Sequence, residues 1–135
     1  MKLLIDANVL LDVLQERPGY VQASSLVWKL CETNMAEGFV SALTFADLVY
    51  VMRKELDPPK IEEVFEKLSF IFEFTELSPG DISRAAALKW DDFEDALQSV
   101  TAMRLCADYI VTRNTKDFKE SAICAVTPKE ILKLI

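Results

Sequence analysis

Residues 1–15 read MKLLIDANVLLDVLQ, and this stretch decides the fold class. Residues 3–5 form a short apolar run, which is typical of a buried strand. Asp6 follows directly, and from residue 8 to residue 15 apolar side chains recur at helical spacing. A buried strand that passes through a carboxylate into a helix is the beginning of an α/β unit, with the carboxylate at the end of the strand where such folds bind ligands.

The rest of the chain alternates between strand and helix patterns in the same way. Strands are expected at 38–41, 70–74 and 109–112, and helices at 21–34, 44–55, 61–68, 79–89, 93–106 and after Pro128. Strands separated by helices pair in parallel, because a crossover helix connects neighbouring parallel strands. The sequence therefore predicts a three-layer α/β/α sandwich around a central parallel sheet.

The length and composition are those of one globular domain. At 135 residues, with 51% apolar and 27% charged side chains, the chain is expected to fold as a single domain spanning residues 1–135. No apolar run approaches the roughly eighteen residues of a membrane span. The first apolar run is too short for a signal-peptide core, so we expect a cytoplasmic protein.

The absence of histidine excludes several kinds of catalytic site. Ser-His-Asp triads, paired-histidine ribonuclease chemistry and most zinc sites need histidine, and the three cysteines are too scattered to replace it. The net charge of −7 is unusual for a protein that binds nucleic acid, since phosphate contacts supply much of the affinity. The same acidic excess suits carboxylates that converge on Mg²⁺ or Mn²⁺. Composition does not choose between these two interpretations.

Acidic and amide side chains recur where the predicted strands end and the following helices begin. These residues are Asp6, Asp47, Asp92, Asp95, Asn114 and Asp117. If the helices all begin at one edge of the sheet, the side chains converge there, at the edge where parallel sheets bind ligands.

Helix capping is a competing explanation for the same pattern. An acid three residues after Ser, Thr, Asp or Asn resembles a capping box. The pairs with this spacing are Thr44…Asp47, Asp92…Asp95, Asn114…Asp117, Ser78…Asp81 and Thr127…Glu130, and no catalytic role is assigned to the last two. Asp6 is harder to explain by capping, because a carboxylate directly after a buried strand needs a strong partner.

Four segments in order resemble the motifs of the PIN-domain family, in particular its VapC-type toxins. They are residues 4–12 (LIDANVLLD), 40–48 (VSALTFADL), 93–98 (FEDALQ) and 110–118 (IVTRNTKDF). Together they span nearly the whole chain. The resemblance implies a Mg²⁺- or Mn²⁺-dependent endoribonuclease, a hydrolase of RNA phosphodiester bonds that acts as the toxin of a toxin–antitoxin pair.

Carried onto this chain, the resemblance implies a metal site of four aspartates, Asp6, Asp47, Asp95 and Asp117. The second motif usually carries Glu, so the shorter Asp47 is expected to reach the metal through water. Many relatives have an acid where this chain has Asn114, which leaves Asn114 or Asp117 as the fourth ligand. Supporting roles are assigned to Asn8, Thr112, Asn114 and Asp92, whereas Asp12 is placed on a solvated helix face.

Two sets of side chains are candidates for partner contacts. The basic residues Arg53, Lys54, Arg113, Lys116 and Lys119 are candidates for RNA phosphate contacts, with a solvated surface as the alternative. The helix at 44–55 is apolar nearly all round, so it is either buried on every side or covers a subunit interface, to which Trp28 and Trp90 would add. The family resemblance favours a homodimer that takes up an antitoxin segment.

Three other classes of protein are weighed against the nuclease. A signalling receiver domain requires adjacent acids after the first strand, and this chain has Asp6 followed by Ala7. A phosphatase of the haloacid-dehalogenase type requires Asp-x-Asp, whereas residues 6–8 read DAN. A catalytically weak PIN-like interaction module remains open, since Asp47 and Asn114 depart from the family pattern.

Overall fold

The computed structural model describes all residues from Met1 to Ile135, arranged around one five-stranded sheet. Its strands are β1 (Lys2–Ile5), β2 (Glu37–Ser41), β3 (Glu73–Thr75), β4 (Tyr109–Val111) and β5 (Ala125–Val126). They lie in the order β3-β2-β1-β4-β5, and every neighbouring pair is parallel. The predicted parallel sheet is confirmed.

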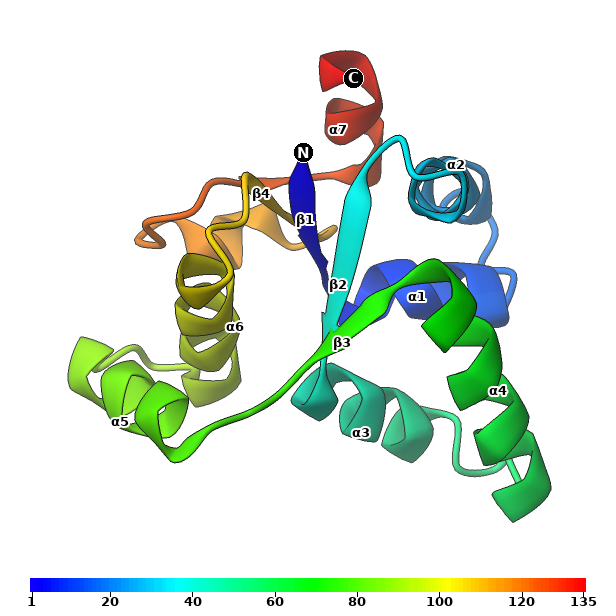
Figure 1. Cartoon of the computed structure of the whole chain (residues 1–135), viewed down its shortest axis with the longest axis horizontal. Helices are drawn as coiled ribbons and strands as arrows, with labels where there is room; N and C mark the ends of the chain where they lie inside the picture. Colours follow the sequence, from blue (N-terminus) through cyan, green and yellow to red (C-terminus); the bar gives the residue numbers. More distant parts are fainter.

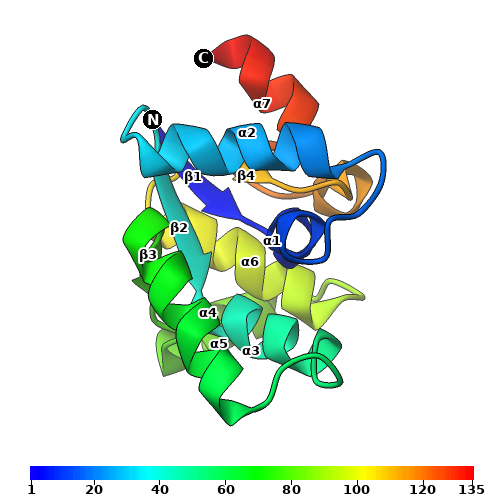
Figure 2. The same ribbon diagram turned by 90° about the vertical axis from the view of Figure 1, so that its right-hand side faces the viewer.

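Helices cover both faces of this sheet, which confirms the predicted three-layer α/β/α architecture. They are α1 (Ala7–Leu14), α2 (Val21–Glu32), α3 (Ala42–Val51), α4 (Pro58–Ile71), α5 (Pro79–Leu88), α6 (Phe93–Arg104), the 3₁₀ helix η1 (Thr115–Phe118) and α7 (Pro128–Leu134). The sheet separates α5 and α6 from α1, α2 and α4 (Figure 1). Helix α7 lies beside α2 (Figure 2). None of these helices is long and apolar enough to cross a membrane.

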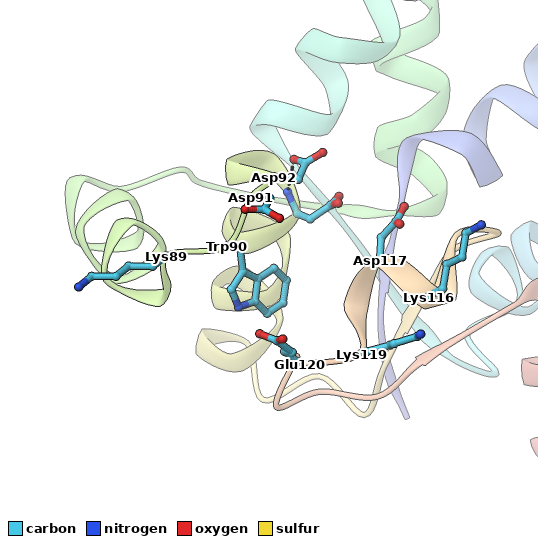
Figure 3. Close-up of a pocket in the computed structure, with 9 residues that line it drawn as sticks. Lys89, Trp90, Asp91, Asp92, Lys116, Asp117, Lys119 and Glu120 are labelled. Carbon is cyan, nitrogen blue, oxygen red and sulfur yellow. Dashed lines mark hydrogen bonds between the residues drawn. The ribbon is translucent and has the colours of Figure 1, made fainter.

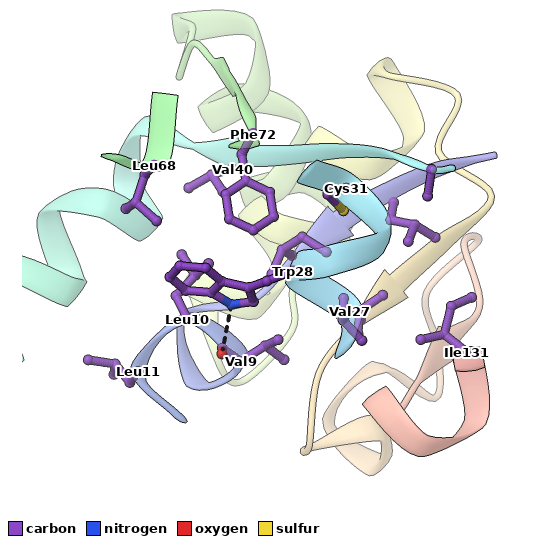
Figure 4. Packing of buried hydrophobic residues seen from close by; sticks show 14 of the residues in the cluster. Val9, Leu10, Leu11, Val27, Trp28, Cys31, Val40, Leu68, Phe72 and Ile131 are labelled. Carbon is purple, nitrogen blue, oxygen red and sulfur yellow. Dashed lines mark hydrogen bonds between the residues drawn. The ribbon is translucent and has the colours of Figure 1, made fainter. Parts of the chain in front are cut away.

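Alternating side chains of β1 supply the apolar cores on the two faces of the sheet. Leu3 and Ile5 lie in the larger core, which α1, α2 and α7 cover, whereas Leu4 packs with Ile110 on the opposite face. Trp28 lies inside the larger core and donates a hydrogen bond from Nε1 to a backbone carbonyl of α1 at 3.4 Å (Figure 4). The expectation that Trp28 adds to a partner surface is therefore wrong.

The strand order places a topological switch point between β1 and β4. From β1 the chain adds β2 and then β3 on one side, and it returns to add β4 and β5 on the other. Connections that leave in opposite directions open a crevice at the carboxyl ends of the two strands, which is where open α/β sheets bind ligands. Asp6 follows β1 and Thr112 follows β4, so both lie at this point.

Most of the predicted elements differ in their bounds by a few residues, and two of these differences have a clear cause. Residues 70–74 were expected as a strand, but α4 continues to Ile71 and β3 starts only at Glu73. Phe70 is 89% exposed, so the apolar run is the end of a helix rather than a buried strand. The helix expected at 44–55 instead begins at Ala42, because Ser41 caps it by accepting a hydrogen bond from the Thr44 backbone N–H at 3.0 Å.

The short strand β5 and the 3₁₀ helix η1 were missed altogether. β5 has two residues and η1 has four, too few to produce a periodic pattern.

Gly38 of β2 lies where the neighbouring side chains leave no room for a Cβ atom. A Cβ atom at this position would lie 2.6 Å from Cys31 Sγ and 2.7 Å from Phe72 Cδ1. We therefore expect Gly38→Ala to lower the free energy of unfolding by about 1–3 kcal/mol, the usual effect of overpacking. Urea denaturation measures the change.

Gly80 is the matched control for this substitution. It lies in the first turn of α5, where an added Cβ would meet nothing closer than 3.4 Å. Gly80→Ala should leave stability unchanged or raise it, because Ala has the higher helix propensity. If the two substitutions changed the free energy of unfolding equally, Gly38 would not be as closely packed as described.

Candidate functional site

Asp6 lies at the centre of the site because it is both the end of β1 and the N-cap of α1. Its Oδ1 atom accepts a hydrogen bond from the Ala7 backbone N–H at 2.9 Å and a longer one from Gln98 Nε2 at 3.4 Å. Its Oδ2 atom accepts from the Thr112 hydroxyl at 2.8 Å and from Asn8 Nδ2 at 3.3 Å. Four donors from three elements hold this carboxylate in one orientation, as a ligand requires.

Asn8 and Thr112 connect the first helix to the loop that follows β4. Asn8 Nδ2 donates to the Thr112 hydroxyl oxygen at 3.1 Å, and Asn8 Oδ1 accepts from the Arg113 backbone N–H at 3.0 Å. The Thr112 hydroxyl also accepts from the Asn114 backbone N–H at 3.1 Å. These bonds fix the carboxyl ends of β1 and β4 relative to each other, and they give Asn8 and Thr112 a positioning role.

The start of α6 contributes the second group of acids. Asp92 caps the helix by accepting a hydrogen bond from the Asp95 backbone N–H at 3.1 Å. Beside it lies a cavity of about 360 Å³, which Figure 3 shows. Its lining residues are Lys89, Trp90, Asp91, Asp92, Asp95, Lys116, Asp117, Lys119 and Glu120. Asp95 and Asp117, far apart in the sequence, thus face the same cavity.

Mutual repulsion shows that the carboxylates form one electrostatic cluster. The pKa of Asp95 is raised to about 7, and burial is the largest cause. The pKa of Asp95 is also raised by four nearby negative charges, those of Asp92, Asp117, Asp6 and Glu94. Burial also raises the pKa of Asp6 against the hydrogen bonds that it accepts, and the charge of Asp47 adds to that rise. The four predicted aspartates therefore act on one another at one edge of the sheet.

Glu94 and Gln98 belong to this site and were missed in the sequence. Burial raises the pKa of Glu94, and the charge and side-chain contact of Asp47 raise it further. Gln98 is buried and donates to Asp6. Gln98 lies three residues after Asp95 on α6, so helical spacing could have found it. Glu94 directly precedes Asp95, and spacing on the helix does not indicate it.

The structure shows which of the five pairs at capping-box spacing form a complete capping box. Ser78…Asp81 and Thr127…Glu130 are complete capping boxes, in which the acid accepts a hydrogen bond from the capping residue's backbone N–H. In the three pairs assigned to the site, the acid makes no such bond. Helix α3 is capped by Ser41 rather than by Thr44, and η1 has no side-chain cap at Asn114. Asp92 does cap α6, but the Asp95 side chain accepts no bond from the Asp92 backbone in return. The carboxylates of Asp47, Asp95 and Asp117 are therefore not used in capping.

The two candidates for the fourth ligand point to different places. Asp117 lines the cavity that contains Asp95, and its charge raises the pKa of Asp95. Asn114 lines a separate cavity, beside Tyr20 and Arg113. The geometry thus favours Asp117 over Asn114.

Asp12 is buried, which contradicts the prediction from the sequence. It was placed on a solvated helix face, yet its exposed fraction is 0%. Its Oδ2 atom accepts from Arg113 Nε at 3.0 Å and from Ser24 Oγ at 2.9 Å, while Oδ1 has no hydrogen-bond partner. Arg113, expected at an RNA phosphate or on a solvated surface, is therefore the counter-ion of a buried carboxylate.

The other basic candidates divide into two groups. Lys116 and Lys119 line the acidic cavity, and neither forms an ion pair with a carboxylate. Arg53 lies at the end of α3, where it stacks on the Tyr50 ring at 4.2 Å. Neither Arg53 nor Lys54 lines this cavity.

The donor set fits a hard divalent cation in its chemistry. The carboxylate oxygens are the ligands that Mg²⁺ and Mn²⁺ prefer, and the repulsion between these groups is relieved by positive charge. The cavity is lined by five carboxylates and three lysines, so one divalent cation would balance its charge. No three acidic side chains stand in a ready-made metal-binding arrangement, so the ligands would have to rotate inward around the ion.

Comparison with known proteins identifies the family. The sequence model of the PIN domain matches residues 2–116, and the chain belongs to the PIN-domain family. No curated protein matches it.

Three solved structures illustrate the likeness in fold. A chain of VapBC2 from Rickettsia felis, bound to a DNA fragment from its promoter, is 17% identical with a TM-score of 0.72, over 94% of this chain and 98% of that one. A chain of a toxin–antitoxin complex from Klebsiella pneumoniae is 23% identical with a TM-score of 0.71, over 93% and 96%. VapC20 from Mycobacterium tuberculosis, a toxin that cleaves the sarcin–ricin loop, is 9% identical with a TM-score of 0.64, over 80% and 86%.

Proposed function

We propose that residues 1–135 form one catalytic domain, a Mg²⁺- or Mn²⁺-dependent endoribonuclease that acts as the toxin of a toxin–antitoxin pair in the cytoplasm. The observation that carries this proposal is the cluster of mutually repelling carboxylates at the switch point of a PIN-domain fold. Three of them, Asp47, Asp95 and Asp117, are not used in capping. Similarity to VapC20, a toxin that cleaves the sarcin–ricin loop, supports RNA as the substrate.

Asp6, Asp95 and Asp117 would hold the cation, with Asp47 reaching it through water. When bound, the cation lowers the pKa of a water molecule to supply the nucleophile and polarises the scissile phosphate. Thr112 and Asn8 keep the Asp6 carboxylate oriented, and Gln98 restrains its other oxygen.

The remaining residues at the site bind the substrate and manage its charge. Lys116 and Lys119 contact phosphates of the RNA backbone, which offsets the acidic surface around them. Asp92 holds the start of α6 in place through its cap to the Asp95 backbone. Carboxyl groups that do not bind the cation, such as Glu94, take up the proton that the nucleophile releases.

The test is an RNA cleavage assay with Mg²⁺ or Mn²⁺ and with EDTA. We expect cleavage only with a divalent cation, and we expect Asp6→Asn to remove it while leaving the circular dichroism spectrum unchanged. Glu63→Gln is the matched control, because it removes one negative charge from the exposed face of α4. Metal-independent cleavage, or cleavage by Asp6→Asn at the wild-type rate, would refute the proposal.

The fourth ligand gives a separate prediction. We expect Asp117→Asn to lower cleavage by about a hundredfold or more, because even residues that only support a metal ligand contribute roughly 10–100-fold. Asn114→Ala should change cleavage by less than about tenfold, because its side chain lies outside the acidic cavity. Cleavage rates at saturating Mg²⁺ decide between them, and the reverse order of effects would make Asn114 the ligand.

Exposed apolar side chains on α3 and α4 support a homodimer and an antitoxin contact. Tyr50 is 65% exposed, and Val51, Phe65 and Phe70 are also exposed. Phe45 of α3 packs edge-on against Phe65 of α4, with 5.4 Å between the ring centroids, so the two helices contact each other there. Apolar surfaces of this kind commonly bind partners. Light scattering at micromolar concentration tests the dimer, and a monomer near 15.3 kDa would refute it.

A catalytically weak interaction module is the second candidate. Asp47 favours it, because the shorter side chain replaces the usual Glu of the second motif. The cleavage assay separates the two, since a module of this kind would bind partners without any metal-dependent cleavage.

A further inference from the structure

Trp90 stands out in the acidic cavity as its one hydrophobic lining residue. All the other side chains around it carry a charge. The indole extends from the turn between α5 and α6 into the space between these groups (Figure 3). An aromatic ring beside a carboxylate cluster does not help to bind a cation such as Mg²⁺, so its presence calls for a different ligand.

The ring is held in place by apolar side chains of two elements. Trp90 packs against the edge of Phe118 at 6.5 Å between ring centroids and 70° between planes. It also contacts the apolar side chains between α5 and α6, yet it remains partly exposed. Binding to a ring that is already fixed costs little conformational entropy.

Three lysines line the same cavity as this ring. Lys89 precedes Trp90 in the chain, and Lys116 and Lys119 lie across the cavity. None of the three forms an ion pair, although acids line the same cavity. Their charges are therefore free for phosphate, and the cavity of about 360 Å³ falls in the usual range for small-ligand sites.

We propose that Trp90 is a stacking platform for one unpaired base of the RNA next to the scissile phosphate, with Lys116 and Lys119 on the adjoining phosphates. This inference rests on the proposed ribonuclease function and assigns Trp90 a role in binding its substrate. A base offers a face for stacking only when it is splayed out of a helix. Stacking on an aromatic side chain accepts any base, so Trp90 selects for strandedness rather than for sequence.

The test compares Trp90→Phe with Trp90→Leu, because both keep an apolar side chain and only Phe keeps a ring. Binding of a short single-stranded oligouridylate is measured in EDTA, where no cleavage is expected, by fluorescence anisotropy of a labelled RNA. We expect the Phe variant to bind within about twofold of wild type and the Leu variant to bind roughly tenfold more weakly. A labelled RNA duplex should bind all three proteins equally.

Two controls separate stacking from other effects. Lys116→Met should weaken binding of both RNAs alike, because phosphate contacts do not sense strandedness. Met35→Ala removes an exposed apolar side chain outside the cavity and should change neither affinity. RNA should also quench the fluorescence of Trp90 in the wild type, whereas Trp28 is buried in the core.

Equal binding by the Phe and Leu variants, or an equal loss for single-stranded and duplex RNA, would overturn the proposal. Failure of the ribonuclease function gives a different result. In that case wild-type protein cleaves no RNA with Mg²⁺ or Mn²⁺, while the difference between the Phe and Leu variants in binding remains.

Discussion

Asp95→Asn is expected to abolish metal-dependent cleavage and at the same time to stabilise the metal-free protein. The cleavage rate should fall by about a hundredfold or more, because the variant lacks a ligand rather than a residue that supports one. The gain in stability follows from repulsion, since burial and four neighbouring carboxylates raise the pKa of Asp95 to about 7. Asn removes that unfavourable charge with little change in shape.

The raised pKa of Asp95 also makes the stability of the metal-free protein depend on pH. Between pH 3.8 and about 7 the folded protein keeps a proton on Asp95 that the unfolded chain releases. Folding stability therefore falls as the pH rises through this range in the absence of metal. In Asp95→Asn this part of the decline should be missing. Thermal unfolding in EDTA at several pH values measures it.

A competing effect works in the opposite direction and is smaller. Asp95 lies in the first turn of α6, where a negative charge gains about 0.3–1 kcal/mol from the helix dipole. Several like charges close to a partly buried carboxylate outweigh that gain. With saturating Mg²⁺ the order should reverse, and the wild type should be the more stable protein. A variant that is less stable than wild type in EDTA would contradict the repulsion.

The second large effect is expected for Arg113→Ala, which leaves Asp12 buried without its nearest counter-ion. Asp12 is fully buried, and Arg113 Nε lies 3.0 Å from its Oδ2 atom. Arg17 remains, but at 3.8 Å from Oδ1 it is too distant for a hydrogen bond. Removing one partner of a buried pair costs about 3–5 kcal/mol. We expect the melting temperature to fall by roughly 10 °C or more.

Two variants make the cause identifiable. Arg53→Ala removes an exposed arginine that stacks on the Tyr50 ring and donates a hydrogen bond to the Tyr50 carbonyl, and it should cost about 1 kcal/mol. Asp12→Leu combined with Arg113→Leu should recover much of the lost stability, because replacing both charges avoids the unpaired carboxylate. If Arg113→Ala were as mild as Arg53→Ala, the ion pair with Asp12 would not be a structural element of the fold.

Much of the fold could be predicted from the sequence, because many strands and helices are determined by residues that are close together in the chain. β1, Asp6 and α1 follow from a buried apolar run, a carboxylate and helical spacing within fifteen residues. The same kind of pattern misassigned Phe70, since a short apolar run does not distinguish a strand from the end of a helix.

The site was predictable only in part, because its remaining features depend on contacts between distant residues. Asp12 and Arg113 are 101 positions apart, and nothing near Asp12 in the sequence indicates that it is buried. Trp90 meets Lys116 and Lys119 only once η1 has packed beside α6. The spacing of acids alone did not separate capping from catalysis either. That distinction required the hydrogen bonds of Asp81 and Glu130, which complete their capping boxes.

The most direct test of the carboxylate cluster as a metal site is calorimetric titration of Mn²⁺ into the metal-free protein. The wild type and Glu63→Gln should bind the ion with the same affinity, and Asp95→Asn should bind it much more weakly. This result would place the cation among the carboxylates at the switch point. Equal Mn²⁺ affinity in wild type and Asp95→Asn, or no binding by the wild type at all, would contradict the account.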